Sequence, residues 1–512
     1  MSVDSVLNPF SSIATADIDK LRARLLELNY QEATFHKILP AFMQGDPTLG
    51  GAFPVLQHIK TPDPGLATMI LLFVGELPVA ETDCRVALGE ALFEALLAAD
   101  FLKRSEAGTI TCPLALISIK DIYIVADRAT DNSPELVKHL VMAAGPSSVT
   151  LANATPRRRV RKALDIGCGG GVQSLQLAKH VDHVVGVDIN ERALNLGRFA
   201  AQLSGAANID FRYSDFFSAV EGEKFDLIVA NPPFVISPES TSQYRDGGLG
   251  GDRVTETVIR NAGAFLEEGG ISVTVCEWAS LRGASANERM QQWTAGNGCD
   301  VWISYGTPVE PSRYALTWLQ GDQRRLSLAD YSQKYDRWVA HYEALGMQSM
   351  QTGLVVLRKR AGENWFYADE APDEMRGQWG STLLMMFDLL DNIKNSSLDQ
   401  LLDQPYKLAP QARMRHMLAQ DGARWGQISA ELLLEEPLNY TGRVDHHIAK
   451  LCARCDGTVT LRQLLLELAE SVGRPFEKIL DAAMPVLMGL LTRGFLIPAS
   501  IVPPVKETAP AA

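Results

Sequence analysis

ALDIGCGGG, residues 163–171, joins a short apolar run to a turn that is rich in glycine. The apolar run predicts a buried strand, and the sequence GVQSLQLAKH (171–180) predicts a helix after it. Gly167, Gly169 and Gly171 allow a tight turn and let a ligand approach the backbone, while the first N–H groups of the helix stay unpaired. A strand-to-helix turn also needs glycine for steric reasons, so this pattern requires support from the flanking sequence.

Apolar runs and amphipathic helices alternate through the central region, residues 135–362. Seven runs predict strands: ALDIG (163–167), HVVGVD (183–188), NIDFRY (208–213), FDLIVA (225–230), ISVTVCEW (271–278), CDVWISY (299–305) and GLVVLRKR (353–360). Strands that alternate with helices form a parallel sheet covered on both faces, so the expected fold class is α/β, a Rossmann-like domain with a seven-stranded sheet. Ligands of such sheets bind at the carboxyl ends of the strands, near the point where the strand order reverses.

Three acidic residues fall at three successive strand ends. Asp188 ends the second strand, about 20 residues after the glycines, where a carboxylate can accept hydrogen bonds from both ribose hydroxyls. Asp215 and Phe216 follow the third strand, placed to bond an adenine amino group and to cover its ring. Asp165 precedes the first glycine, where it would repel a phosphate but suit an ammonium or sulfonium group. A Rossmann-like domain that binds nothing is the alternative, and the three matched strand ends argue against it.

The fourth strand runs into two prolines and an aromatic ring, in FDLIVANPPFVISP (225–238). The nitrogen of an amide or of an exocyclic base amine is a poor nucleophile, because its lone pair is delocalised into a π system. The side-chain carbonyl of Asn231 and the backbone carbonyl of Pro232 can hold the two N–H groups of such a nitrogen and turn its lone pair outward. Pro232 and Pro233 have no N–H that would occupy these carbonyls, and Phe234 can stack on the planar group. These four residues are the candidate catalytic set, and a simple proline-rich turn is the alternative.

Four segments, ALDIGCGGG, VVGVDIN (184–190), YSDFF (213–217) and FDLIVANPPF, resemble the successive motifs of class I S-adenosylmethionine-dependent methyltransferases. Asn-Pro-Pro-Phe narrows the resemblance to the group that includes adenine-N6, guanine-N2 and release-factor glutamine methyltransferases. The resemblance covers residues from about 140 to 360, and it implies S-adenosyl-L-methionine as the cofactor. The cofactor-binding residues that it implies are Asp165 near the methionine amino group, Gly167, Gly169 and Gly171 in the turn, Asp188 on the ribose, the adjacent Ile189, and Asp215 and Phe216 at the adenine.

The loop after Asn-Pro-Pro-Phe leaves the methyl acceptor open. Tyr244, Arg245 and Asp246 project from a glycine-rich stretch that can close over a substrate, although a solvated loop is an equal alternative. The glycine-rich loop is similar to that of some glutamine methyltransferases, whereas Phe234 is commoner in ribosomal RNA guanine-N2 enzymes. We therefore expect N-methylation of a planar nitrogen, with protein glutamine slightly preferred. A base of rRNA, tRNA or DNA is one alternative, and a non-catalytic module that retains the cofactor is another.

The texture of the chain changes on both sides of the central region. Residues 1–134 predict helices followed by a β-hairpin, an α+β domain that is winged-helix-like and contacts a substrate or partner. Residues 363–500 predict a mainly helical interaction domain, and residues 501–512 a disordered tail. Added domains on both sides of the catalytic one favour a macromolecular substrate, either protein or RNA, since a small molecule needs only a pocket.

Composition limits the classes of protein that this chain can represent. The 512 residues carry a net charge of −13, which argues against a surface devoted to nucleic acid but leaves room for a local basic site. The seven cysteines are scattered and odd in number, as in a reduced cytoplasmic chain. Cys452 and Cys455 have the spacing of zinc ligands, but no second pair follows them, so no metal site is expected. No apolar run is long enough to span a membrane, and the oligomeric state stays open.

Overall fold

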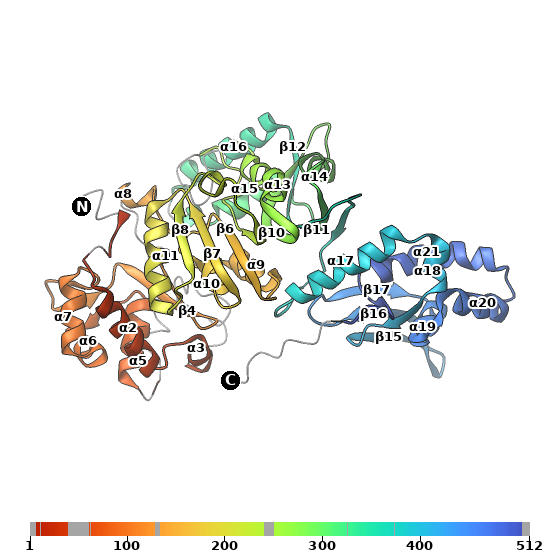
Figure 1. The fold of residues 1–512 in the computed structure, drawn as a ribbon, viewed down its shortest axis with the longest axis horizontal. Coiled ribbons are helices and arrows are strands. Elements are labelled where there is room, and N and C mark those ends of the chain that lie inside the picture. Colours follow the sequence, from red (N-terminus) through yellow and green to blue (C-terminus); the bar gives the residue numbers. More distant parts are fainter. Residues whose placement is uncertain are drawn as a thin grey trace. The chain divides into compact units, whose positions relative to one another are not determined.

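The structure is a computed structural model that describes residues 7–10, 12–38, 61, 63–128, 134–239, 250–324, 326–372 and 374–503. The chain divides into two compact units. The first joins Met1–Ala152 to Arg159–Asp369, and the second joins Asn153–Arg158 to Glu370–Ala512. Figure 1 shows the elements of both units, coloured from red at the N-terminus to blue at the C-terminus.

An eight-stranded sheet forms the centre of the first unit, with the strand order β13-β11-β12-β10-β9-β6-β7-β8. The strands are β6 (Val160–Ile166), β7 (Val181–Asp188), β8 (Ile209–Tyr213), β9 (Phe225–Ala230), β10 (Leu266–Leu281), β11 (Cys299–Tyr305), β12 (Met347–Lys359) and β13 (Phe366–Glu370). Strands β6 to β10 run parallel, but β12 pairs antiparallel with β10 and β11, so the expectation of a parallel sheet is wrong at β12. All seven predicted strands are present in this Rossmann-like mixed sheet, and β13 adds an eighth strand that was not predicted.

The order of the sheet reverses at β6, because the chain continues through β7 and β8 on one side and through β9 and β10 on the other. The pairing register places Ile166 of β6 opposite both Val187 of β7 and Ala230 of β9. The ends of these three strands are therefore level. The glycine turn, Asp188 and Asn231 follow them at one edge of the sheet, where open α/β sheets bind ligands.

Helices cover this sheet, as Figure 1 shows. They are α10 (Val172–Leu177), α11 (Glu191–Ser204), α13 (Arg253–Phe265) and α14 (Ala286–Thr294). Asn190 caps α11, because its side chain accepts a hydrogen bond from the backbone of Arg192, and Gly205 ends the helix in a left-handed conformation. A further pair, α15 (Pro311–Leu319) and α16 (Leu328–Leu345), lies between β11 and β12 in the chain.

The N-terminal part of the first unit contains helices and two small sheets. Its elements are α2 (Thr15–Glu27), α3 (Glu32–Ile38), α5 (Pro64–Met69), a π-helix (Ile70–Val74), β1 (Val79–Ala80), α6 (Glu81–Leu88), α7 (Glu90–Ala98), β2 (Lys103–Arg104), β3 (Thr109–Thr111), β4 (Leu114–Ile119) and β5 (Ile122–Asp127). The first three strands form a sheet of order β1-β3-β2, and β4 pairs with β5. The predicted order of helices before a hairpin is therefore present.

The N-terminal part shares one hydrophobic core with the outer face of α11. Phe10 stacks on Phe199 of α11 with ring centroids 4.0 Å apart. Beside this core, the guanidinium of Arg192 pairs with the carboxylate of Asp127, and both side chains are almost fully buried. This part and the sheet domain thus lie in the same compact unit, and a domain boundary at residue 134 stays a prediction.

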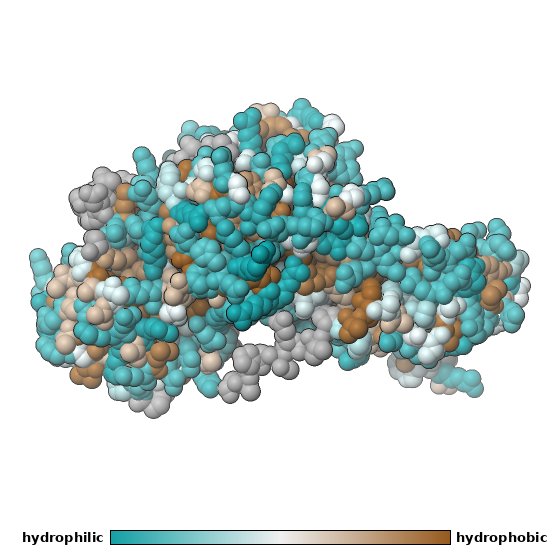
Figure 2. All heavy atoms as spheres, viewed as in Figure 1, coloured by the Kyte–Doolittle hydropathy of each residue, from teal (hydrophilic) through white to brown (hydrophobic). Residues whose placement is uncertain are grey.

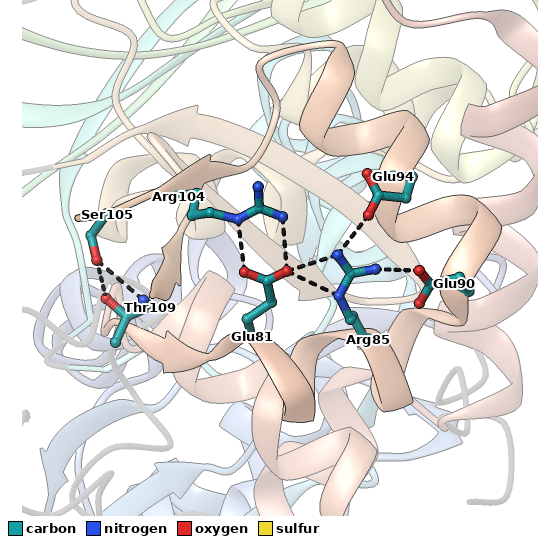
Figure 3. Close-up of polar contacts among 7 residues, drawn as sticks. All are labelled: Glu81, Arg85, Glu90, Glu94, Arg104, Ser105 and Thr109. Carbon is teal, nitrogen blue, oxygen red and sulfur yellow. Dashed lines mark hydrogen bonds and ion pairs between the residues drawn. The ribbon is translucent and has the colours of Figure 1, made fainter. Parts of the chain in front are cut away.

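A surface ion network joins β2 to the two helices before it (Figure 3). Glu81 accepts hydrogen bonds from Arg104 at 2.7 Å and from Arg85 at 2.7 Å, and Arg85 also pairs with Glu90 and Glu94. These contacts lower the pKa of Glu81, with the hydrogen bond from Arg104 as the largest cause. The network orients α6, α7 and β2, but exposed ion pairs contribute little to stability.

The second unit mixes helices and strands, and the expectation of a mainly helical C-terminal domain is wrong. Its elements are α17 (Gly380–Asn395), α18 (Leu398–Asp403), β14 (Pro405–Leu408), β15 (Ala412–Asp421), β16 (Arg424–Leu434), β17 (Tyr440–Val444), α19 (His446–Ala453), β18 (Asp456–Thr460), α20 (Leu461–Val472), α21 (Phe476–Thr492) and β19 (Leu496–Pro498). Two sheets form, of order β15-β16-β17 and β18-β14-β19. The strand β16 forms because its apolar residues recur at every second position: Ala430, Leu432 and Leu434 are buried, and the residues between them are not. Gly422, with a φ of +59°, turns β15 into β16.

Hydrophilic residues cover most of the face in Figure 2, with apolar residues in scattered groups. No helix in the described part of the chain is long and apolar enough to cross a membrane. The cytoplasmic location inferred from the sequence stays a prediction, and so does the tail, because residues 504–512 lie outside the described ranges.

Candidate active site

The glycine turn after β6 takes conformations that suit glycine. Gly167, Gly169 and Gly171 have φ angles of +65°, +51° and +85°. A Cβ atom on Gly171 would lie 3.0 Å from the ring of Phe211, so this glycine is required by packing. A Cβ on Gly169 would meet no atom within 4 Å, and one on Gly167 would lie 3.8 Å from the Cα of Pro232. The turn therefore borders open space and lies against the start of Asn-Pro-Pro-Phe.

Asp188 ties the end of β7 to the glycine turn. Its Oδ2 accepts a hydrogen bond from the N–H of Gly169 at 2.8 Å, and its Oδ1 accepts one from the N–H of Asn190 at 2.8 Å. Burial raises the pKa of this carboxyl above its ordinary value, although the backbone hydrogen bonds oppose the effect. The carboxylate is thus held by the backbone on both sides at the edge of the sheet.

Asp165 is buried beneath the turn, with 1% of its surface exposed. Its Oδ2 accepts hydrogen bonds from the backbone N–H of Ser174 at 2.8 Å and from the hydroxyl of Ser174 at 2.6 Å. Burial raises the pKa of Asp165 to about 7. These contacts fix the start of α10 against β6. The role of Asp165 at a methionine amino group stays a prediction.

The adenine-side candidates lie at the ends of β7 and β8. Ile189 is 45% exposed, and Asp215 is also exposed. Phe216 has a φ of +50°, which is a strained conformation for a non-glycine residue. Ser214 stabilises this turn, because its hydroxyl donates to the carbonyl of Phe216 at 2.9 Å and accepts from the N–H of Ala219 at 3.0 Å. Ser214 was not predicted as a site residue, although it lies inside the YSDFF segment.

Asn231 holds an unsatisfied hydrogen-bond acceptor. Its Nδ2 donates to the hydroxyl of Ser148 at 3.2 Å, whereas its Oδ1 is buried and has no hydrogen-bond partner among the described residues. Ser148 lies in α9 (Pro146–Ala154), and its carbonyl accepts from Nε2 of Gln173 at 2.7 Å, which holds the helix against α10. A buried acceptor without a partner costs free energy unless a ligand supplies the donor. The Oδ1 of Asn231 is thus a buried acceptor that the described residues leave unpaired, and its role toward a substrate stays a prediction.

The remaining candidates divide into those that the structure brings to this site and those outside it. Pro232 is buried, while Pro233 and Phe234 are partly buried, and the Phe234 ring packs on the cluster formed by α15 and α16. Tyr244, Arg245 and Asp246 lie outside the described residues. The structure therefore gathers the turn, the acidic strand ends and Asn-Pro-Pro-Phe at one edge, and it leaves the substrate-loop prediction open.

Comparison with known proteins identifies the family. Residues 145–282 match the model of the methyltransferase small domain. A release factor glutamine methyltransferase from Koribacter versatilis is 32% identical over 198 residues, which cover 34% of this chain and 67% of that enzyme. The chain belongs to the class I S-adenosylmethionine-dependent methyltransferases. Its cofactor is S-adenosyl-L-methionine, and as an enzyme it is not a binding module that merely retains that cofactor.

Two further relatives of this methyltransferase act on different methyl acceptors. A ribosomal protein uL3 glutamine methyltransferase from Xanthomonas campestris is 33% identical over 133 residues, which cover 23% of this chain and 42% of that enzyme. A ribosomal RNA small subunit methyltransferase C from Salmonella arizonae is 34% identical over 126 residues, which cover 24% of this chain and 33% of that enzyme. Because less than half of either relative is spanned, these matches leave the substrate of this methyltransferase undetermined.

The remaining comparisons concern the fold and the C-terminal region. A solved methyltransferase from Pyrococcus furiosus is 14% identical, covers 43% of this chain and 85% of its own, and superposes with a TM-score of 0.27, too low to support an inference. Residues 386–498 match a domain of unknown function (DUF7782).

The residues at the sheet edge fit S-adenosylmethionine. The open space beside Gly169 accommodates a ligand against bare backbone, and Asp188 carries a carboxylate beside it. The unpartnered Oδ1 of Asn231 belongs to the residue that follows β9, the strand beside β6. The next residue, Pro232, lies against Gly167 of the glycine turn. The individual binding roles of Asp165, Gly167, Gly169, Gly171, Asp188, Ile189, Asp215 and Phe216 stay predictions.

Proposed function

We propose that this methyltransferase transfers the methyl group to a planar nitrogen of a macromolecule, either a side-chain amide or an exocyclic base amine. The observation that carries the proposal is the buried Oδ1 of Asn231, which has no hydrogen-bond partner among the described residues. Its own N–H group is engaged by Ser148, so the amide is held with its oxygen free. Such an oxygen can accept a hydrogen bond from a substrate N–H group. Methyl transfer to that nitrogen does not require a general base.

The proposed chemistry follows from two carbonyl groups held rigidly. Asn231 Oδ1 and the backbone carbonyl of Pro232 accept the two N–H groups of the substrate nitrogen, which draws the lone pair out of conjugation. Pro232 and Pro233 fix the backbone and offer no N–H to compete. The ring of Phe234 stacks on the planar group. When bound, S-adenosylmethionine would supply an electrophilic methyl group: the N–C bond forms as the S–C bond breaks, the sulfur keeps the electron pair, and the surplus proton would leave the product nitrogen to solvent.

Cofactor binding is assigned to the edge formed by β6, β7 and β8. Asp188 and Ile189 hold the ribose, and Asp215 and Phe216 the adenine. Gly167, Gly169 and Gly171 let the cofactor lie against the backbone, with Asp165 near the methionine amino group. The bond between Asp188 and the Gly169 N–H supports this assignment, because it couples the ribose side to the turn.

Protein glutamine is the slightly preferred methyl acceptor. Two similar enzymes are named for glutamine in a release factor and in ribosomal protein uL3, and the net charge of −13 disfavours a broad nucleic-acid surface. A base of RNA, with guanine N2 first, is the second candidate, supported by Phe234 and by the similarity to the ribosomal RNA enzyme. The helix and strand order of the N-terminal part is that of a winged-helix-like module, which we assign to substrate or partner contact, as we do the C-terminal region.

A label-transfer experiment tests the proposal. The purified protein and tritiated S-adenosylmethionine are incubated with a bacterial release factor, with ribosomal protein uL3, and with small ribosomal subunits. We expect label that survives RNase and is lost with protease, and N5-methylglutamine in an exhaustive enzymatic digest. Label lost with RNase would favour the base acceptor, whereas methyl ester or O-methyl products from every substrate would refute a planar nitrogen.

A further inference from the structure

The helix pair α15–α16 packs directly on the chain that follows Asn-Pro-Pro-Phe. We call residues 231–239 the post-β9 segment. Val235 and Ile236 of this segment are buried in one cluster with Tyr314 of α15 and Trp338 and Tyr342 of α16. Figure 1 shows the pair as part of the same unit as the sheet. The segment itself contains no strand, so its position depends on these side-chain contacts.

Two tyrosine hydroxyls hold both backbone groups of one residue in this segment. The N–H of Ile236 donates to the hydroxyl oxygen of Tyr314 at 3.4 Å. The hydroxyl of Tyr342 donates to the carbonyl of Ile236 at 2.9 Å. Tyr314 and Tyr342 are 3% and 0% exposed, so water does not compete for these bonds. A residue held at both its backbone donor and its backbone acceptor has little freedom to shift.

The Tyr314 hydroxyl is itself fixed by the central sheet. It donates to a carboxyl oxygen of Glu277 on β10, and the other oxygen of Glu277 accepts from the hydroxyl of Thr352 on β12 at 3.0 Å. Thr274 of β10 lies opposite Ala230, the last residue of β9, so Glu277 stands three residues beyond that strand's end. The hydrogen bonds from Ile236 through Tyr314 and Glu277 to Thr352 therefore fix the position of Ile236 relative to β10 and β12. A charged residue inside the apolar run ISVTVCEW was its only signal in the sequence.

A second contact holds the far end of the segment. Lys334 of α16 pairs with Glu239 at 3.1 Å and with Asp322 at 2.8 Å, and Arg337 lies 3.7 Å from Glu239. The pairing at Ala230 fixes one end of the post-β9 segment, and α16 fixes the other.

We infer that α15–α16 is a positioning element for methyl transfer, in which Tyr314 and Tyr342 act as positioning residues that set the place of Asn231 and Phe234. The inference rests on the proposed function. The rigid Pro232–Pro233 step transmits a displacement of Ile236 to the two carbonyls before it. Catalysis by orientation is sensitive to such displacements, since about 1 Å can cost roughly 10²-fold in rate.

The test compares Tyr314→Phe, Tyr342→Phe and the double variant with Tyr335→Phe as control. Tyr335 is on α16 and packs on the same cluster, but its hydroxyl has no hydrogen bond to the described residues of the segment. Hydrogen–deuterium exchange of peptides covering 231–239 should accelerate in the first three variants and not in the control. Isothermal titration should find S-adenosylmethionine affinity within about twofold of the wild type, because the cofactor contacts are elsewhere.

Single-turnover methyl transfer completes the test, with release factor, uL3 and small ribosomal subunits as probes. We expect the transfer rate of the double variant to fall by roughly 10–100-fold with the half-saturating acceptor concentration little changed, and the control to keep its rate. Unchanged exchange across 231–239, or a full transfer rate in the double variant beside a slow Asn231→Ala, would overturn the inference. A full rate in Asn231→Ala would instead refute the proposed function, whatever the tyrosine variants do.

Discussion

Replacing Asp188 tests the cofactor assignment, and the structure predicts how large the effect should be. The carboxylate accepts hydrogen bonds from the N–H groups of Gly169 and Asn190, both at 2.8 Å. Asp188→Ala removes the proposed acceptor of the ribose hydroxyls and leaves the Gly169 N–H unpaired. Both losses act on the same side of the cofactor site, so they should reinforce each other.

Hydrogen bonds to a charged group contribute about 1.5–3 kcal/mol, and this range is the expected loss of binding free energy. It corresponds to an increase in Kd of roughly 10- to 150-fold. Asp188→Asn is the matched control, because it keeps the size of the side chain and one carbonyl oxygen. We expect about half the loss in free energy for this variant, since one uncharged acceptor replaces two charged ones.

Isothermal titration with S-adenosylmethionine measures the effect, and a thermal melt confirms that each variant is folded. Because burial raises the pKa of Asp188, protonation competes with binding, and wild-type affinity should fall as the pH is lowered. The Asn variant should lose that pH dependence. Unchanged affinity in a folded Asp188→Ala protein would refute the assignment.

Three further predictions concern stability and the turn. Burial raises the pKa of Glu277 from 4.5 to about 7, so the stability that this carboxyl contributes is fully present below pH 4.5 and is lost as the pH rises through 7. In urea titrations across this pH range, Glu277→Gln should reduce the decline in unfolding free energy to the share that Asp165 causes. A decline as steep as that of the wild type would contradict the prediction. Arg192→Ala leaves the buried Asp127 carboxylate without its charged partner and should lower the unfolding free energy by about 3–5 kcal/mol. A second substitution, Asp127→Asn, should restore much of this loss. Strictly additive effects of the two substitutions would argue against a stabilising ion pair. Gly169→Ala should lower the melting temperature through strain at a φ of +51° and should also weaken cofactor binding, because its methyl group enters the open space of the turn; unchanged cofactor affinity would place the cofactor elsewhere.

The sequence predicted the elements whose pattern is local. The periodicity of the apolar runs located seven of the eight strands of the sheet, and the glycine pattern located the turn after β6. The level strand ends followed from the parallel arrangement, because parallel strands present their carboxyl ends at one edge. The candidate site could therefore be outlined without coordinates.

The contacts that complete the site depend on tertiary packing. Ser148 and Asn231 are 83 residues apart, and nothing in either local sequence indicates that they meet. The same holds for Tyr314 and Ile236, which are 78 residues apart. In the C-terminal region β15 was missed because it is mostly exposed, so its alternation of apolar and polar residues is weak.

Single-turnover methyl transfer by Asn231→Ala tests the central claim most directly. The measurement uses saturating S-adenosylmethionine and whichever of the three probes accepts label from the wild type. Removing one preorganised hydrogen-bonding group should lower the transfer rate by roughly 10²–10³-fold, with cofactor affinity within about twofold. A transfer rate equal to that of the wild type would mean that Asn-Pro-Pro-Phe is only a turn at the end of β9, and the proposed mechanism would be wrong.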